Sequence, residues 1–188
     1  MSPGRRGKLI VISGPSGVGK STITREVLHR TGAEYSISAT TRQPRPGEED
    51  GREYRFMTRD AFQRMVEQGR LLEWAEVFGN LYGTPAEPVQ QAVRGGRAIV
   101  LEIDVQGGIQ VHKKMPNAEF VLIVPPSETE LRRRLKDRGT EDAASYEARC
   151  DKAVEELQLA RQSGAYRHEV VNDDLYRAVE EVVTIVNV

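Results

Sequence analysis

A glycine-rich segment near the start of the chain limits the folds that are open to it. Residues 14–21 read Gly-Pro-Ser-Gly-Val-Gly-Lys-Ser and fit the pattern G-x-x-x-x-G-K-[ST]. The apolar run 8–13 before this segment predicts a buried strand, and the helical spacing of apolar residues after it predicts a helix over 20–30. A strand, a glycine-rich turn and a helix in this order are typical of a phosphate-binding loop, or P-loop.

The P-loop supplies the groups that bind a nucleoside triphosphate. Its glycines let the backbone direct N–H groups inward at a phosphate, and the N-terminal end of the following helix adds positive potential. Lys20 can reach the β- and γ-phosphates, and the hydroxyl of Ser21 can ligate Mg²⁺. The alternative is a glycine-rich helix start that binds no ligand. P-loops serve switches, motors and kinases alike, so the motif alone does not determine the reaction.

Strands and helices alternate over most of the chain. Apolar runs at 98–103 and 119–124 predict buried strands, and residues 169–171 predict a short last strand. Helical patterns lie between and after these strands, at 105–114, 128–136, 143–162 and 173–186. Such alternation is typical of βαβ units, whose parallel sheet is covered by helices on both faces. The sequence therefore predicts an α/β fold with three layers, α/β/α, around a parallel core sheet.

Two segments depart from this alternation. Residues 36–84 are short polar stretches with frequent turn residues and one predicted helix at 58–68, and together they predict an inserted α+β lobe. Within the lobe, Gly79-Asn80 indicates a hairpin turn. The polar stretch 138–144 lies between two predicted helices and predicts a mobile lid.

Composition narrows the function classes. The 188 residues include 27 basic and 28 acidic ones, and this balance argues against a general nucleic-acid binder. No apolar run approaches the ~18 residues of a transmembrane helix, and the apolar stretch near the N-terminus is too short for a signal peptide. The single cysteine, Cys150, excludes a disulfide framework. We expect a cytoplasmic protein with neither a nucleic acid nor a membrane as partner, whereas protein partners stay unknown.

Charged residues of the predicted lobe are candidates for recognition. Arg42 and Arg45 are three residues apart, and two guanidinium groups held close repel each other unless an anion lies between them. Phosphate suits their bidentate geometry, but two arginines of a solvated loop are the alternative. Strand alternation places Glu73 and Trp74 on opposite faces, where Glu73 is either a recognition residue or plain exposed charge.

Two further carboxylates follow a buried strand. Glu102 and Asp104 lie at the C-terminal end of the strand at 98–103, beside the P-loop in a parallel sheet. Mg²⁺ obtains its outer support at such a position in P-loop proteins. Residues 104–107 also have the D-x-x-G form of GTP-dependent switches.

Together these segments resemble the guanylate kinase family. The matching pieces run in family order and span nearly the whole chain: GPSGVGKST (14–22), SATTRQPRPGE (38–48), GREYRF (51–56), LLEWAEVFGNLYGT (71–84), LEIDVQGG (101–108), RRRLKDRGTE (132–141) and VVNDDL (170–175). The resemblance implies phosphorylation of GMP to GDP by ATP with Mg²⁺. It also implies a single domain over 1–188, with a core of 7–35 and 85–188, a GMP-binding lobe at about 36–84 and a lid at about 137–150.

The resemblance implies a role for each matched residue. The guanine would contact Ser38, Glu73 and Thr84, and the GMP phosphate would contact Arg42, Arg45, Tyr54 and Tyr82. Glu102 and Asp104 would complete the GMP site, and Ser21 and Asp104 would hold Mg²⁺. ATP would be bound by Gly14, Pro15, Ser16, Gly17, Val18, Gly19, Lys20, Ser21, Thr22 and Asn172. The catalytic residues would be Lys20, Arg134, Arg138 and Arg149.

The chemistry of guanine agrees with this assignment. Guanine presents two adjacent donors, N1–H and N2–H₂, and a carboxylate such as Glu73 can accept from both.

Three alternatives to a guanylate kinase are open. A non-enzymatic module of the same fold would have a degraded P-loop, whereas Lys20 and Ser21 are present. A GTP-hydrolysing switch would need an N-K-x-D motif, and residues 171–174 lack the lysine. A kinase for another nucleoside monophosphate is the third.

Overall fold

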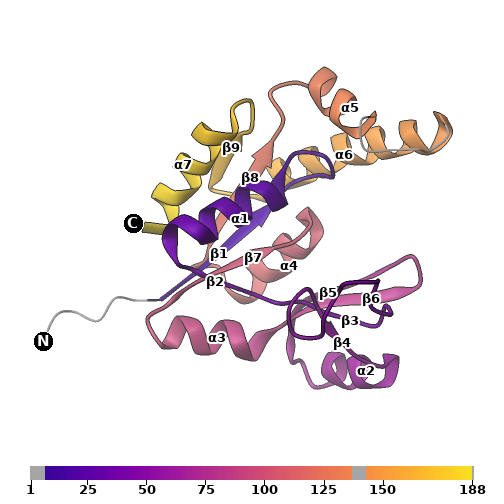
Figure 1. Cartoon of the computed structure of the whole chain (residues 1–188), viewed down its shortest axis with the longest axis vertical. Helices are drawn as coiled ribbons and strands as arrows, with labels where there is room; N and C mark the ends of the chain where they lie inside the picture. The colour runs from indigo at the N-terminus through magenta and orange to yellow at the C-terminus, as the bar shows by residue number, and fades with distance from the viewer. Residues whose placement is uncertain (1–6, 137–142, 188) are drawn as a thin grey trace, which may run out of the picture.

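A five-stranded parallel sheet forms the centre of the computed structural model, which describes residues 7–136 and 143–187 (Figure 1). Its strands have the spatial order β2-β7-β1-β8-β9, and every neighbouring pair is parallel. Their bounds are β1 Lys8–Ser13, β2 Glu34–Tyr35, β7 Ala98–Glu102, β8 Glu119–Val124 and β9 His168–Val171. The predicted parallel core sheet is therefore confirmed, with β2 as an edge strand that the sequence pattern did not indicate.

Side chains of β1 alternate between two apolar clusters on opposite faces of this sheet. Leu9 and Val11 pack with helices α3 (Ala86–Arg94) and α4 (Val105–Lys114). Ile10 and Ile12 pack with helices α1 (Lys20–Thr31) and α7 (Leu175–Asn187). Because helices cover both faces, the strand is apolar at consecutive positions. These contacts give the predicted three-layer α/β/α arrangement.

The predicted helices occur close to their expected bounds, with two differences. Helix α3 was not predicted. It contains Pro88 in its first turn, where the missing N–H leaves no helical hydrogen bond unmade. Helix α7 begins at Leu175 rather than at 173, because the Asp174 carboxylate accepts the backbone N–H of Arg177 at 2.9 Å and thus caps the helix.

Helices α5 (Glu128–Lys136) and α6 (Ala143–Ser163) follow β8. Leu131 and Leu135 of α5 join the cluster that contains α1 and α7, together with Cys150 of α6. Farther along α6, Ala160 packs on the opposite face of the sheet, beside α4. The expected lid begins in residues 137–142, which lie outside the described residues. Its remaining part belongs to the start of α6.

A second, smaller sheet is built from residues 39–85. Its strands have the order β4-β3-β6-β5, with β3 Ala39–Thr40, β4 Arg55–Phe56, β5 Leu71–Val77 and β6 Asn80–Pro85. Helix α2 (Arg59–Glu67) packs Phe62 against Ala39 and Leu81 of this sheet. Figure 1 shows this sheet and α2 to one side of the large sheet, and α5 and α6 at the opposite end of the molecule.

The predicted hairpin of this sheet is present. Strands β5 and β6 are joined by Phe78 and Gly79, which both have positive φ angles of 49° and 77°. Two successive positive φ angles are typical of the tight turns that match the twist of a hairpin. The turn lies one residue earlier than the Gly79-Asn80 pattern predicts, and Phe78 is fully exposed at its tip.

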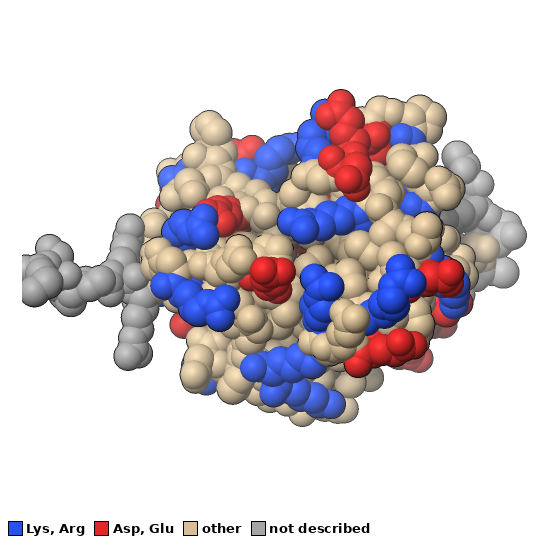
Figure 2. All heavy atoms as spheres, turned by 90° about the horizontal axis from the view of Figure 1, so that it is seen from below, with Lys and Arg blue, Asp and Glu red and all other residues tan. Residues whose placement is uncertain are grey.

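Charges of both signs are interspersed on the face of the molecule seen in Figure 2, so this face carries no continuous patch of one sign. Among the described residues, no helix combines the length and the hydropathy that crossing a membrane requires.

Candidate active site

The P-loop connects β1 to α1 and depends on glycine at two tight points. Gly14 and Gly19 have φ angles of 152° and 94°. A Cβ atom on Gly14 would lie 2.4 Å from the carbonyl oxygen of Ile123, and one on Gly19 would lie 2.5 Å from the side-chain nitrogen of Asn172. Both positions thus combine a backbone conformation that favours glycine with a close approach by a neighbouring strand or loop.

The charged side chain of Lys20 lies against the carbonyl groups of this loop. Its ammonium donates hydrogen bonds to the carbonyls of Gly14 and Pro15, at 2.5 and 2.9 Å. Lys20 is also the first residue of α1, so the ammonium and the N-terminus of the helix both contribute positive potential at the loop. The P-loop residues predicted to bind ATP therefore lie together, in the loop between β1 and α1 and at the start of that helix.

Asn172 links the P-loop to the end of strand β8 through hydrogen bonds. Its side-chain amide donates to the Val18 carbonyl at 2.7 Å, and its backbone N–H donates to the Val124 carbonyl at 2.9 Å. The residue is buried, with 7% of its surface exposed. It lines a hollow of about 440 Å³ together with Gly17, Gly19, Thr22, Arg134, Asp173 and Leu175. The structure thus gives the residue predicted to lie near adenine a second role in holding the loop.

Arg134 reaches the same hollow from helix α5. Its guanidinium donates to the Asn172 carbonyl at 2.9 Å and to the Glu130 carboxylate at 2.7 Å. The guanidinium groups of Arg133 and Arg134 lower the pKa of Glu130 to about 2, so this carboxylate stays charged and keeps Arg134 paired. Of the other predicted catalytic arginines, Arg149 is half-buried in α6, and Arg138 lies outside the described residues.

Oxygen ligands gather beside the P-loop where β7 ends. The Ser21 hydroxyl donates to the Glu102 carboxylate at 2.6 Å. Asp104 is exposed and caps α4, because its carboxylate accepts the backbone N–H of Gly107 at 2.7 Å. Hydroxyl and carboxylate oxygens suit Mg²⁺, which commonly takes one or two protein ligands and completes its shell with phosphate and water. Within the described residues, no cluster of three or more His, Cys, Asp or Glu forms a metal-binding cage.

A buried carboxylate lies between the small sheet and the start of helix α4. Glu73 of β5 is 6% exposed, and its Oε1 accepts a hydrogen bond of 2.5 Å from the Thr84 hydroxyl of β6. Burial, together with the nearby charge of Asp104, raises the pKa of Glu73 to about 7, although the hydrogen bond from Thr84 opposes the shift. A Cβ atom on Gly107 would lie 3.2 Å from Glu73 Oε2, so the start of α4 borders this carboxylate. Trp74, the residue after Glu73, is exposed.

Helix α4 holds the strand that carries Glu73. The Gln110 side chain accepts from the backbone N–H of Trp74 at 3.3 Å and donates to its carbonyl at 3.2 Å. The Lys114 ammonium donates to the Leu71 carbonyl at 2.8 Å. These contacts were not predicted, because nothing in the spacing of a helix tells which strand its polar side chains will meet.

Three of the four residues predicted to bind the GMP phosphate lie together. The Arg42 guanidinium lies 5.5 Å from the ring centre of Tyr54 and 5.8 Å from the ring centre of Phe56. The rings of Tyr54 and Tyr82 are 6.0 Å apart. The side chain of the fourth residue, Arg45, is exposed. Ser38, half-buried before β3, accepts the backbone N–H of Arg55 at its carbonyl.

An anion does lie beside these arginines, but it belongs to the chain. The carboxylate of Glu48 accepts two hydrogen bonds from the Arg42 guanidinium, at 2.9 and 3.0 Å. This pairing lowers the pKa of Glu48. The argument from repulsion between Arg42 and Arg45 therefore does not by itself require a bound phosphate. Glu48, the anion that pairs with Arg42, was not predicted from the sequence.

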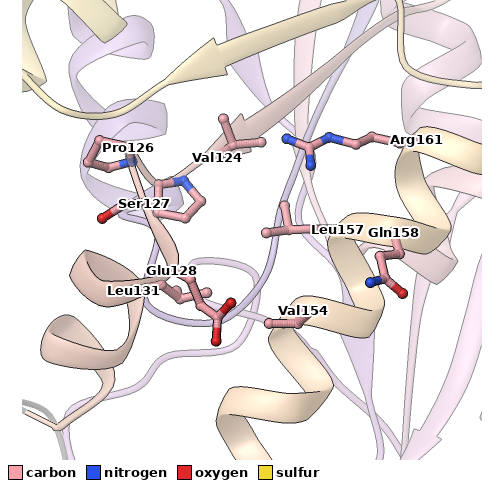
Figure 3. Close-up of a pocket in the computed structure, with 10 residues that line it drawn as sticks. Val124, Pro126, Ser127, Glu128, Leu131, Val154, Leu157, Gln158 and Arg161 are labelled. Atoms are coloured by element: carbon pink, nitrogen blue, oxygen red, sulfur yellow. The ribbon is translucent and has the colours of Figure 1, made fainter.

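A second hollow lies away from these residues. It has a volume of about 300 Å³ and is lined by the end of β8, the start of α5 and the second half of α6 (Figure 3). Val124, Leu131 and Leu157 point into it, and Arg161 lies at its rim. None of the predicted site residues lines this hollow, so we leave it outside the candidate site.

The chain is similar to known proteins over almost its full length. The family model described as guanylate kinase matches residues 6–188. The chain belongs to the guanylate kinase family. Proteins named guanylate kinase from Rubrobacter xylanophilus and Gloeobacter violaceus are 50% and 51% identical to it over 182 and 176 residues. These alignments cover 96% and 93% of this chain and 94% and 84% of the relatives.

Solved structures agree with the sequence relatives. A crystal structure of guanylate kinase from Anaplasma phagocytophilum superposes with a TM-score of 0.74 at 32% identity, covering 97% of this chain and 86% of that one. A gluconokinase from Sinorhizobium meliloti shares the fold with a TM-score of 0.51 at 15% identity. The resemblance to guanylate kinases in the sequence motifs is thus confirmed, and so is the P-loop α/β fold. The chain is an enzyme of the kinase class rather than a non-enzymatic module.

Proposed function

We propose that this guanylate kinase binds ATP at the P-loop and GMP between the small sheet and helix α4. The reaction is the transfer of a phosphoryl group from ATP to GMP, which gives ADP and GDP. The observation that carries the assignment of the two sites is the buried Glu73–Thr84 pair, at 2.5 Å, on a different sheet from the P-loop. A kinase that transfers a phosphoryl group between two nucleotides needs a separate binding site for each of them.

Guanine recognition is assigned to Glu73 and Thr84. The ionised carboxylate can accept from N1–H and N2–H₂ of guanine at once, whereas adenine has an acceptor at N1 and would leave a buried carboxylate oxygen unpaired. The hydrogen bond from Thr84 supports the charged form of Glu73 and fixes its orientation. Ser38 and Asp104 are assigned to the rest of the base.

The phosphate of GMP is assigned to Arg42, Tyr54 and Tyr82, with Arg45 as a second cation. The rings of Tyr54 and Phe56 hold the Arg42 guanidinium by cation–π contact, and the hydroxyls of Tyr54 and Tyr82 supply further hydrogen-bonding groups. This site brings the nucleophilic phosphate oxygen towards the core, where the P-loop holds the donor.

Donor binding is assigned to residues 14–22, with Asn172 on the adenine side. Phosphoryl transfer needs chiefly position and positive charge, because charge spreads over the oxygens of the transferred group. Lys20 supplies this charge from the loop, and Arg134, Arg138 and Arg149 are assigned to supply it from the side of the predicted lid. No group of the chain has to act as a general base.

Mg²⁺ is assigned to Ser21 and Asp104, with Glu102 beside them as the acceptor of the Ser21 hydroxyl. When bound, the ion would neutralise negative charge on the phosphates of ATP. The cytoplasmic location, the lid and the division into core and GMP-binding lobe stay predictions from the sequence.

One assay tests the substrate assignment. Release of ADP is measured with ATP and Mg²⁺ against a panel of AMP, CMP, UMP, dTMP and GMP. We expect turnover with GMP and little with the other four. A preference for another monophosphate would favour the third alternative from the sequence, and ADP release without any monophosphate would indicate an ATPase.

A further inference from the structure

The guanidinium of Arg42 is held by an acid of its own loop. Glu48 Oε2 accepts from Nη1 at 3.0 Å and Oε1 accepts from Nη2 at 2.9 Å, so the ion pair is bidentate. The two side chains are only 15% and 17% exposed. Bidentate geometry and enclosure distinguish this pair from the exposed ion pairs that contribute little.

Glu48 is itself tied to the turn between the two arginines. The backbone N–H of Arg45 donates to Glu48 Oε2 at 2.7 Å, and the backbone N–H of Glu48 donates to the Arg45 carbonyl at 3.0 Å. The carboxylate thus accepts three hydrogen bonds, two from Arg42 and one from Arg45. A phosphate that displaced it would have to break all three, so a carboxylate that stays in place is the less costly arrangement.

Arg42 has a further edge for a second anion. A guanidinium carries five N–H donors. Nη1 is taken up by Glu48 and by the Gln43 carbonyl at 2.8 Å, and one donor of Nη2 is taken up by Glu48. The edge formed by Nε and Nη2 is the one that does not carry the bidentate pair. One edge therefore fixes the side chain while another can bind.

We propose that Glu48 is a positioning residue for the acceptor nucleotide. It holds Arg42 in the orientation that binds the phosphate of GMP, and it stays paired with Arg42 in the complex. This inference rests on the proposed role of Arg42. Its physical basis is preorganisation, because a long side chain ordered before binding loses little further freedom when the ligand arrives. In the alternative arrangement, Glu48 competes with GMP for Arg42, and GMP displaces it on binding.

The two arrangements predict effects of opposite sign for Glu48→Gln, which keeps the size of the side chain and removes its charge. With Glu48 as a positioning residue, the KM for GMP rises about tenfold, equivalent to about 1.4 kcal/mol, while kcat and the KM for ATP change less than about twofold. Guanosine, which lacks the phosphate, is measured as a competitive inhibitor against GMP. Its inhibition constant is expected to stay within about twofold of the parent value.

Glu53→Gln is the matched control. Glu53 accepts the backbone N–H of Glu49 at 2.8 Å and the Arg52 side chain at 2.6 Å in the same loop, so its loss perturbs the loop without removing the acid that pairs with Arg42. We expect its KM for GMP to equal that of the parent. Tighter binding of GMP by Glu48→Gln would identify a competitor and overturn the proposal, as would an unchanged KM.

Two further outcomes separate this inference from the proposed function. Equal weakening of guanosine and GMP in Glu48→Gln would indicate a distorted lobe and would also overturn the positioning role. Arg42→Met is measured in the same assay. If it has the parent KM for GMP, the assignment of the phosphate site is wrong. If it weakens GMP binding and Glu48→Gln does not, only the role of Glu48 is wrong.

Discussion

The hydroxyl of Thr84 donates a 2.5 Å hydrogen bond to the carboxylate of Glu73 across the β5–β6 hairpin. Both side chains are buried, so the bond lies in a region of low effective dielectric, where a hydrogen bond to a charged group is strengthened. It opposes the effect of burial on the pKa of Glu73 but does not cancel it. The result is a carboxyl group that changes charge near neutral pH at the proposed guanine site.

Replacing Glu73 tests guanine recognition. In Glu73→Gln, an NH₂ donor replaces one acceptor oxygen and would face a donor of guanine in a poorly hydrated site. An unpaired buried polar group costs about 1–3 kcal/mol, and more where a charge was involved. We expect kcat/KM for GMP to fall about 100-fold or more, at ~1.4 kcal/mol per decade, with the KM for ATP unchanged. Steady-state kinetics measure both constants.

Glu76→Gln on the same strand is the control for this variant. Glu76 is half-exposed and pairs with Arg59, and its replacement should leave kcat/KM for GMP unaltered. Use of GMP by Glu73→Gln within about threefold of the parent would contradict the role of Glu73.

The raised pKa of Glu73 predicts how stability depends on pH. Its pKa in the folded chain is about 7 against 4.5 for the ordinary group, so the folded state binds the proton more tightly. The contribution of Glu73 is therefore most favourable below pH 4.5 and is lost as the pH rises through about 7. This loss amounts to about 3 kcal/mol of unfolding free energy, and Glu73→Gln should escape it.

Urea unfolding of the ligand-free parent and Glu73→Gln at pH 5, 6, 7 and 8 checks this prediction. The glutamine variant should become the more stable protein as the pH rises, and the difference should level off above the pKa. Parallel curves for the two proteins would show that Glu73 does not titrate in this range.

Removal of the P-loop charge should abolish catalysis and spare the fold. Lys20 hydrogen-bonds two loop carbonyls that lie beside its own helix, so Lys20→Ala should keep the parent circular dichroism and unfold within about 1 kcal/mol of the parent. We expect kcat to fall at least ~10³-fold, as for other groups that neutralise transferring phosphate. Lys113→Ala, on the exposed end of α4, should retain the parent rate. Near-parent turnover by Lys20→Ala would exclude the P-loop as the donor site.

Asn172→Ala tests the link between Asn172 and the P-loop. The change leaves the buried carbonyl of Val18 without the amide that donates to it at 2.7 Å. We expect the unfolding free energy to fall by about 1–3 kcal/mol and the KM for ATP to rise, while the KM for GMP stays the same. Chemical denaturation and steady-state kinetics measure these effects. The exposed Asn117→Ala should change none of them, and an equal rise of both KM values would speak against a local role.

The separation of the two proposed sites predicts closure. The P-loop belongs to the large sheet and the Arg42–Tyr54–Tyr82 group to the small one, whereas in-line transfer needs the two phosphates in contact in a water-excluded site. Small-angle scattering should show a smaller radius of gyration with a linked GMP–ATP analogue than without it. An unchanged scattering profile would count against a mobile lobe or lid.

Local patterns determined much of the fold. The P-loop, its flanking strand and its helix are contiguous in sequence, so glycine positions and apolar spacing were enough to predict β1, the loop and a helix at 20–30 that the structure has as Lys20–Thr31. The alternation of apolar runs predicted the parallel sheet in the same way. The two-residue strand β2 was missed because two residues carry no periodicity.

The tertiary structure decided which side chains meet. The pairings of Asn172 with Val18, of Gln110 with Trp74 and of Glu48 with Arg42 left no mark in the spacing of either partner. A periodic pattern reports the face of a helix or strand that is buried, because burial repeats with the geometry of the backbone. It does not report the partner across the interface, because that depends on how separate elements pack. The charge state of Glu73 follows the same rule: its sequence neighbours identify a carboxylate on a strand, and only packing against Thr84 and α4 removes it from water and raises its pKa to about 7.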